Sequence, residues 1–226
     1  MRHTPTYVLT DTDEVKRLVR ENPWATFVSN TAAGLVASHY PVVLEETDGT
    51  STGLSTSTIS IVSHVGRPDE TLHELGQHEM LMIIQGPHGY ISPGWYANED
   101  FVPTWNHVTA HLYGTPEILS DEENFRVLDD LVDHFETQLP EPVSLDIDER
   151  QARRIAKGTV GIRFVVTRFD ARLKLSQNKA PEVIERIIAA LESDGPFASV
   201  PLAAEMRRVR DAVAPADTDR ENNAAS

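Results

Sequence analysis

The chain of 226 residues contains no cysteine. Disulfides, thiolate nucleophiles, cysteine-ligated zinc, iron–sulfur clusters and thiolate-ligated haem are therefore all excluded. Nothing in this composition calls for an oxidising compartment. Imidazole, offered by nine histidines, is then the preferred protein ligand for a transition metal in such a chain.

Long apolar runs are also missing. The start, Met1 to Pro5, has no apolar signal core, and no run approaches the length needed to cross a bilayer. We therefore expect a cytoplasmic protein that makes no membrane contact. The paired histidines of zinc metalloproteases, the nucleophile elbow, the phosphate loop and the dinucleotide fingerprint are absent too, which disfavours the common hydrolase and nucleotide-binding classes.

Basic residues are few. The 20 lysines and arginines face 35 aspartates and glutamates, which gives a formal net charge of -15. Phosphates would be repelled over most of such a surface. The segment Arg207 to Arg210 is rich in arginine, but so few basic residues make a weak electrostatic site for DNA. The charge thus argues against nucleic acid as a partner.

The stretch from Gln85 to Gly114 is rich in Gly, Pro, His and aromatic residues. It follows the apolar run Met80 to Ile84, which predicts a buried strand leading into a loop. A loop with flat rings beside a fixed backbone path is suited to holding a planar ligand. The alternative is a rigid aromatic corner that serves stability alone. The rings concerned are those of His88, Tyr90, Trp95, Trp105 and His107.

The remaining pattern predicts a mainly β chain with peripheral helices. Predicted strands cover residues 24–29, 35–44, 58–64, 79–85, 106–119 and 159–171. Predicted helices begin near Thr12, lie around Leu72 and Leu75, begin at Asp121, and cover residues 148–157, 181–191 and 202–213. In the first helix, Val15, Leu18 and Val19 form the apolar face, and in the helix from Asp121 the stripe Phe125, Leu128, Val132 and Phe135 is expected in the core.

Tight turns between consecutive strands favour an α+β fold built on a mainly antiparallel barrel. We expect residues 1–213 to form one such domain with helical additions, and residues 214–226 to form a disordered C-terminal tail. A small closed barrel has little interior room, so a large planar ligand would lie on its wall, completed by a second subunit.

Three blocks carry a resemblance to a known family: Gln85 to Pro93, Val102 to Asn106, and Lys174 to Asn178. In this order they resemble the PaiB-type family of FMN-binding negative transcriptional regulators, over about Tyr7 to Met206. The resemblance implies an FMN-binding split barrel, akin to pyridoxamine phosphate oxidases, that acts as a homodimer with its cofactor sites at the subunit interface.

The chain departs from the flavin-binding members after the third strand, where they usually continue from a His to an Asn-Pro-Gln-Trp segment. Here two carboxylates, Asp69 and Glu70, follow His64. They would oppose a phosphate dianion, and only Arg67 would attract it. The segment His64 to Arg67 and the block that ends at Lys179 look more similar to the haem-dependent piperazate synthases of the same family.

That closer resemblance implies haem b as cofactor, with FMN as the alternative. It implies His64 as the axial ligand of the haem iron; otherwise His64 caps a strand end. It also implies N5-hydroxy-L-ornithine as substrate and dehydrative cyclisation to L-piperazic acid as the reaction. A flavin-dependent oxidoreductase or carrier, or a regulator that senses a cofactor, stays open beside it.

Further site residues are expected from the same comparison of motifs. Those that would bind or wall the cofactor are Arg67, His88, Tyr90, Val102, Trp105 and His107. Those that would act on the substrate are Lys174, Ser176, Gln177 and Lys179. The alternative for Lys174 is an ordinary surface lysine, and His88 and His107 would otherwise satisfy backbone carbonyls.

Overall fold

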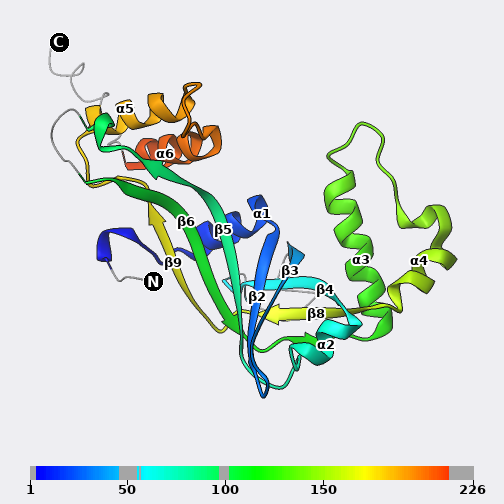
Figure 1. Ribbon diagram of the computed structural model, residues 1–226. Coiled ribbons are helices and arrows are strands. Elements are labelled where there is room, and N and C mark those ends of the chain that lie inside the picture. Colours follow the sequence, from blue (N-terminus) through cyan, green and yellow to red (C-terminus); the bar gives the residue numbers. More distant parts are fainter. Residues whose placement is uncertain (1–3, 46–54, 56, 97–101, 214–226) are drawn as a thin grey trace, which may run out of the picture. The chain divides into compact units, whose positions relative to one another are not determined.

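A computed structural model describes residues 4–45, 55, 57–96 and 102–213 (Figure 1). The predicted tail 214–226 lies outside the described residues. The strands are β1 (Val8–Leu9), β2 (Trp24–Thr31), β3 (Gly34–Leu44), β4 (Ser60–Gly66), β5 (Met80–Ile91), β6 (Thr104–Gly114), β7 (Glu117–Ile118), β8 (Thr159–Val165) and β9 (Arg168–Lys174). The helices are α1 (Thr12–Glu21), α2 (Arg67–Leu72), α3 (Asp121–Glu136), α4 (Glu149–Ala156), α5 (Pro181–Glu192) and α6 (Val200–Val213), with short 3-10 turns at Pro5–Tyr7, Pro93–Trp95 and Leu145–Asp148.

The strands form one nine-stranded sheet in the order β1-β9-β6-β5-β2-β3-β4-β8-β7. The neighbours β2 and β3, β3 and β4, and β4 and β8 pair antiparallel. The predicted mainly β architecture with peripheral helices is confirmed. Among the described residues, no helix is long and apolar enough to span a bilayer.

The chain divides into two compact units. The first contains residues 1–86 and 109–173, and the second contains residues 87–108 and 174–226. Strands β5 and β6 each contribute residues to both units.

The start of the first unit follows its sequence pattern. Asp11 caps α1 by accepting a 2.8 Å hydrogen bond from the Asp13 amide, which satisfies one of the free amides at the helix start. Val15, Leu18 and Val19 are buried as predicted. The strands predicted over 24–29 and 35–44 are confirmed as β2 and β3, which pair as an antiparallel hairpin. Its turn ends at Gly34 with φ +111, a conformation that glycine adopts most easily.

Three strand predictions need correction. The loop expected after Gln85 is wrong, because β5 continues as strand to Ile91 despite Gly86, Pro87 and Gly89. Tertiary pairing thus overrides the turn propensity of these residues. The single strand predicted over 159–171 is also wrong, because two strands, β8 and β9, occupy the segment. The single strand predicted over 106–119 is wrong in the same way, because β6 ends at Gly114 and the separate strand β7 follows it.

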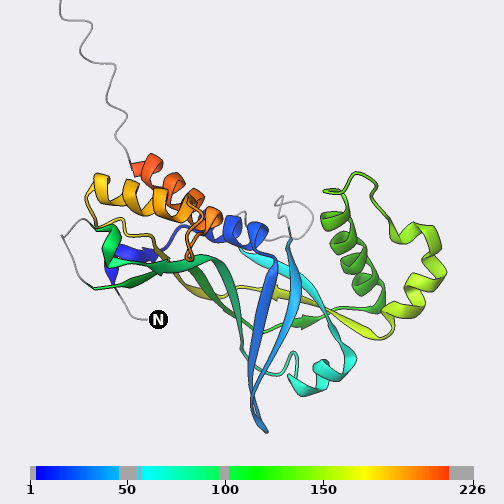
Figure 2. The same cartoon turned by 45° about the horizontal axis from the view of Figure 1, so that its top comes forward.

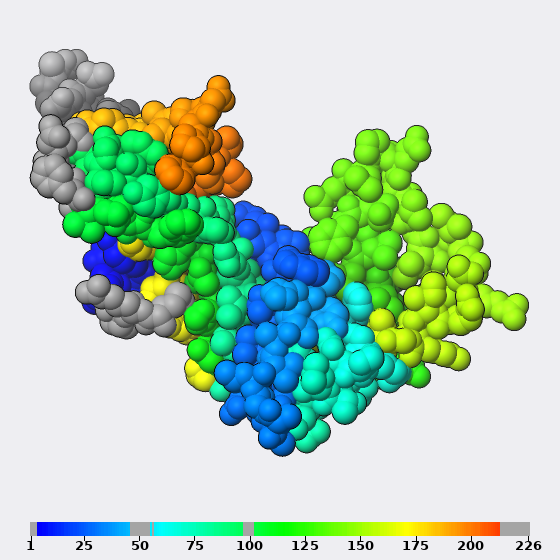
Figure 3. Space-filling view, viewed as in Figure 1, coloured from blue at the N-terminus to red at the C-terminus, as the bar shows by residue number. Residues whose placement is uncertain are grey.

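Helix α3 covers the β4–β8 part of the sheet in the first unit. Ser120 and Glu123 form a capping box at its start. Val127 and Leu131 pack with Val62 and Leu119. The predicted apolar stripe of this helix is therefore only partly right, because Phe125 is buried but Phe135 is 38% exposed. The helix face that packs on the sheet carries Asn124, Val127 and Leu131 instead. Figure 3 shows α3 and α4 lying together in the first unit.

The second unit contains α5 and α6, which pack side by side (Figure 2). Pro181 occupies the first turn of α5, as predicted. Val183, Ile187, Ile188 and Leu191 are buried on α5, and Leu202, Ala203 and Met206 are buried on α6. These side chains form the apolar core of the unit.

Candidate functional site

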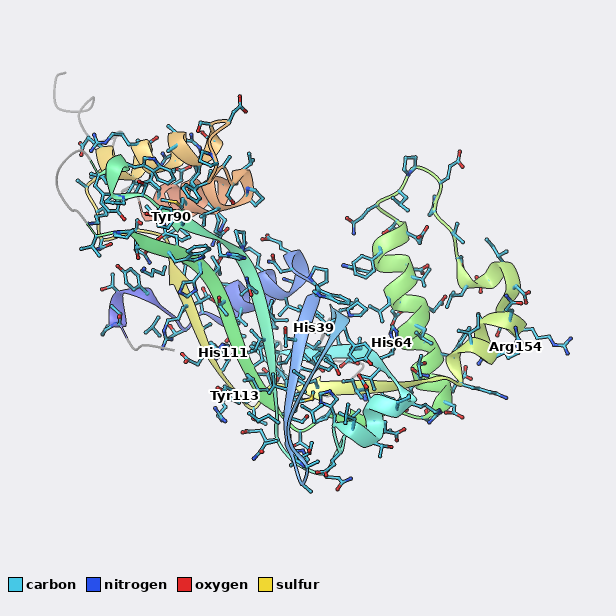
Figure 4. The ribbon with its side chains drawn as sticks, in the orientation of Figure 1. His39, His64, Tyr90, His111, Tyr113 and Arg154 are labelled. Carbon is cyan, nitrogen blue, oxygen red and sulfur yellow. The ribbon has the colours of Figure 1, made fainter. Side chains whose placement is uncertain are left out.

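His64 lies near the end of β4 and is half-buried. Its Nδ1 atom is buried and has no hydrogen-bond partner among the described residues. Burial lowers the pKa of His64, because the charged imidazolium loses hydration. The ring is therefore neutral at physiological pH, and Nε2 is the nitrogen left for a ligand. Figure 4 shows His64 beside α3.

Tyr40 contacts His64 and begins a chain of hydrogen bonds in the first unit. The two rings meet edge to face with centroids 6.4 Å apart. Tyr40 donates to Asp69 Oδ2 at 2.6 Å, and its hydroxyl oxygen accepts from the Gly66 amide at 3.2 Å. Burial first, and then the hydrogen bond to Asp69, raise the pKa of Tyr40. The phenol thus stays protonated beside His64.

The chain of hydrogen bonds continues from Asp69 toward the interior. Ser38 donates to Asp69 Oδ2 at 2.7 Å. The Ser38 oxygen then accepts from His73 Nε2 at 3.0 Å, and Ser29 donates to His73 Nδ1 at 2.9 Å. His73 is only 2% exposed, and burial lowers its pKa. The hydrogen bond from Tyr40 is the main reason why the pKa of Asp69 is lowered.

Arg67 is the first residue of α2, and its guanidinium already bonds to other groups of the chain. Its Nε donates to the Lys157 carbonyl at 2.6 Å. Its other nitrogens lie 3.6 Å from Glu70 and 3.4 Å from Asp121. Glu70 and Asp121 neutralise the charge that was expected to attract a phosphate. A phosphate at Arg67 would have to displace these carboxylates.

Lys174 organises a polar group in the second unit. Its Nζ donates to Thr104 Oγ1, and to the Trp105 carbonyl at 3.0 Å. Burial lowers the pKa of Lys174. No carboxylate is paired with it in the ion pairs of the described residues. Lys174 is therefore half-buried and hydrogen-bonded to the start of β6.

The rings predicted to wall a cofactor contact one another in the second unit. Trp105 Nε1 donates to His88 Nδ1 at 3.2 Å, and the two rings stack with centroids 6.0 Å apart. Tyr90 contacts Trp105 at 6.4 Å and Phe197 at 4.8 Å. Trp105 nevertheless stays 51% exposed, and Val102 68% exposed. His107, which was also predicted to wall the cofactor, is half-buried on β6.

The segment after Lys174 is held by its own hydrogen bonds. Ser176 is buried with φ 61, and it exchanges hydrogen bonds of 3.0 and 3.1 Å with Asn106. Gln177 accepts from the Leu175 amide at 2.7 Å. The Lys179 ammonium lies 4.7 Å from the centre of the Tyr96 ring. These contacts fix the backbone that carries Lys174.

The predicted site residues thus fall into two groups. His64 and Arg67 belong to the first unit, and the others belong to the second. The predictions missed Tyr40, for which no motif gave a signal, and they treated Asp69 only as a charge that opposes a phosphate, not as the partner of Tyr40. They also missed the role of Asn106, although it lies in a block that resembles the family. Within the described residues, no three His, Asp or Glu side chains cluster as a metal site.

The arginine-rich segment of α6 is neutralised by neighbouring carboxylates. Arg207 pairs with Glu192 at 2.8 Å, and Arg208 with Glu205 at 2.9 Å. Arg210 contacts Glu185 and Asp211. Little free positive charge remains to attract a phosphate backbone.

The antiparallel sheet with peripheral helices defines the split-barrel class, as solved structures of similar fold indicate. The FAD and haem binding protein from Mycobacterium smegmatis has a TM-score of 0.55 at 17% identity, over 86% of this chain and 83% of that one. The flavocytochrome Anf3 from Azotobacter vinelandii has a TM-score of 0.55 at 12% identity, over 77% and 72% of the two chains.

The chain belongs to the family described as "Putative FMN-binding domain", whose model matches residues 1–168. It is 29% identical over 191 residues to the protease synthase and sporulation protein PAI 2 from Bacillus subtilis, covering 83% of this chain and 87% of that protein. The predicted PaiB-type membership and the split-barrel fold are therefore confirmed.

Proposed function

We propose that this protein is a haem-dependent piperazate synthase, in which His64 binds the iron of haem b. The substrate is N5-hydroxy-L-ornithine, and the products are L-piperazic acid and water. The observation that carries the proposal is the state of His64: a neutral, half-buried imidazole whose Nδ1 is turned inward without a partner. Such a ring offers Nε2 to one metal centre.

The surroundings of His64 fit this role better than they fit FMN. A haem needs one imidazole from a chain without cysteine, and His64 provides it. FMN needs positive charge for its phosphate, but Arg67 is paired with Glu70 and Asp121. The names of the two split-barrel neighbours refer to FAD and haem and to a flavocytochrome, which supports haem as well as flavin as a ligand on this fold.

When bound, haem iron supplies a Lewis acid that polarises the N–O bond of the hydroxylamine. The α-amine attacks N5, so that an N–N bond forms and the N–O bond breaks. The α-nitrogen gives up one proton and the hydroxyl leaves as water. The electrons balance without a reductant or an oxidant.

Lys174 is the proposed general base. Its lowered pKa makes the free amine more accessible than in an exposed lysine, and a free amine can accept the proton of the substrate's α-ammonium. Ser176 and Gln177 bond within the chain, so we assign them to holding the segment that carries Lys174. Lys179 is proposed to attract the substrate carboxylate.

We further propose that the protein acts as a homodimer. The second unit exposes large apolar side chains, with Val102 at 68%, Trp105 at 51% and Phe197 at 49%. Side chains of this kind favour burial against a second copy. Sedimentation at micromolar concentration tests this part, and a monomer at that concentration would contradict it.

The experiment compares wild type with His64→Ala, and with His39→Ala as the matched control, because His39 is an exposed histidine on the neighbouring strand β3. Each protein is loaded with haem, and its absorption spectrum is recorded. Wild type and His39→Ala should share one Soret band, and His64→Ala should lose or shift it. An unchanged spectrum in His64→Ala would assign the iron to another residue.

The reaction is tested separately. Haem-loaded protein is mixed with N5-hydroxy-L-ornithine in the absence of reductant, and the product is sought by mass, as loss of one water, and by NMR, as the six-membered ring. Ornithine without the hydroxyl should survive. If the hydroxylated substrate also survives, the proposed reaction is wrong.

FMN binding is the second candidate, and the description of the family favours it. A purified protein with flavin absorption and no affinity for haem would replace the haem proposal with a flavin-dependent oxidoreductase or carrier.

A further inference from the structure

Two buried polar atoms without partners lie around the same glycine in the first unit. His64 Nδ1 on β4 and Asn124 Oδ1 on α3 are both buried and both lack a hydrogen bond among the described residues. Asn124 is only 3% exposed. Native proteins rarely leave such atoms unpaired. Two unpaired atoms at one place therefore suggest a hydrogen bond between them.

Gly161 brings the two side chains together. His64 lies directly opposite Gly161 in the β4–β8 pair, and side chains of opposite residues point to the same face with Cβ atoms about 4.5–5.5 Å apart. A Cβ built on Gly161 would lie 3.0 Å from Asn124 Oδ1 and 2.8 Å from Asn124 Cα. His64 and Asn124 therefore extend over the same glycine.

The other end of the Asn124 amide fixes its orientation. Nδ2 donates to the Ala156 carbonyl at 3.3 Å, to the Thr159 carbonyl at 3.4 Å and to Thr159 Oγ1 at 3.1 Å. With the nitrogen held there, Oδ1 is directed toward Gly161. A carbonyl oxygen only accepts hydrogen bonds, so it needs a donor from the side of His64.

We infer that Asn124 Oδ1 accepts a hydrogen bond from His64 Nδ1–H and is the positioning residue for the His64 ring. The pair closes by rotation of the imidazole toward Asn124. The bond holds the neutral ring in the tautomer with its proton on Nδ1, which leaves the Nε2 lone pair free. The pairing deepens the proposed function, and its effect on haem rests on that function.

The tautomer is tested in the full chain without haem. Histidine is labelled with ¹⁵N, and the His64 nitrogen shifts are recorded at a pH where the ring is neutral. Wild type should show the proton on Nδ1, and Asn124→Ala should move the population toward Nε2–H. Thr159→Val is the control, since it removes one partner of Asn124 Nδ2 and should leave the tautomer unchanged. A wild-type ring protonated on Nε2 would overturn the inference, as would an Asn124→Ala ring unchanged from wild type.

The second arm adds haem and records the iron–histidine stretch of the ferrous protein and its reduction potential. A hydrogen bond from Nδ1–H makes the imidazole a stronger donor. Asn124→Ala should thus lower the stretching frequency and raise the potential, whereas Thr159→Val should match wild type. If Asn124→Ala matches wild type in both, Asn124 does not position the ligand. If haem does not bind at His64 while the ¹⁵N result holds, the proposed function fails and the Asn124–His64 pair stands.

Discussion

Replacing Gly161 with alanine is expected to destabilise the packing of α3 on β8. The new methyl group would lie 2.8 Å from Asn124 Cα, 3.0 Å from Asn124 Cβ and 3.0 Å from Asn124 Oδ1. Carbon atoms in contact prefer separations of about 3.5–4.0 Å. Because one of the atoms belongs to the backbone of α3, rotation of a side chain cannot relieve the contact. The helix itself has to move.

The expected cost follows from this displacement. A retreat of about 0.5–1 Å forfeits a quarter to a half of the dispersion energy at each affected contact, and the contacts of Val127 and Leu131 with Val62 lie on the same helix face. Overpacked cores generally lose about 1–3 kcal/mol. Alanine recovers about 0.5–1 kcal/mol relative to glycine within a strand. Taking the middle of each range, about 2 kcal/mol less about 0.75 kcal/mol, the net loss is about 1 kcal/mol.

Urea unfolding followed by circular dichroism measures this loss. With a slope of about 2 kcal/mol/M, the middle of the usual range, the midpoint should fall by about 0.5 M. Gly66→Ala is the matched control, because a Cβ there would meet Pro68 and Tyr40 only at 3.7 Å. Gly66 caps α2, so the control should change stability by less than about 1 kcal/mol. A Gly161→Ala protein as stable as wild type would refute the close packing of α3 on the glycine.

Two further predictions concern acid–base behaviour. Burial lowers the pKa values of His73 and His111. Below the ordinary histidine pKa the unfolded chain therefore binds more protons than the folded chain, and the free energy of unfolding decreases as the pH is lowered. The urea midpoint should therefore drop between pH 7.5 and pH 5.5, about one pH unit on either side of the unperturbed value, and His73→Gln should flatten the drop; an equal drop in that variant would exclude His73 as a cause. Burial also lowers the pKa of Lys174, so the turnover rate should increase with rising pH already at pH values below the usual lysine pKa. The Lys174→Ala variant should lose turnover by about 10²–10⁴-fold and keep the haem spectrum. Loss of the spectrum would instead give Lys174 a role in holding the cofactor.

The parts of the fold that sequence reasoning predicts best are those governed by local rules. Asp11 before Val15, Leu18 and Val19 combines a cap with an apolar face, and α1 follows it closely. The prediction of a loop after Gln85 is wrong for the opposite reason. Its glycines and proline favour a turn, but pairing within the sheet keeps the backbone extended to Ile91, and no local pattern carries that information.

The candidate site divides along the same line. His64 is accessible to sequence reasoning because an imidazole near a strand end is a chemical signal by itself, and because its motif resembles a known family. Asn124 gives no such signal, since an asparagine in the first turns of a helix reads as a solvated polar residue. Its importance depends on the glycine beneath it, and that glycine lies 37 positions further along the chain, opposite His64 in the β4–β8 register. A helix can approach the sheet this closely only where a side chain is missing, so Gly161 brings the Asn124 carbonyl within reach of the one imidazole in β4.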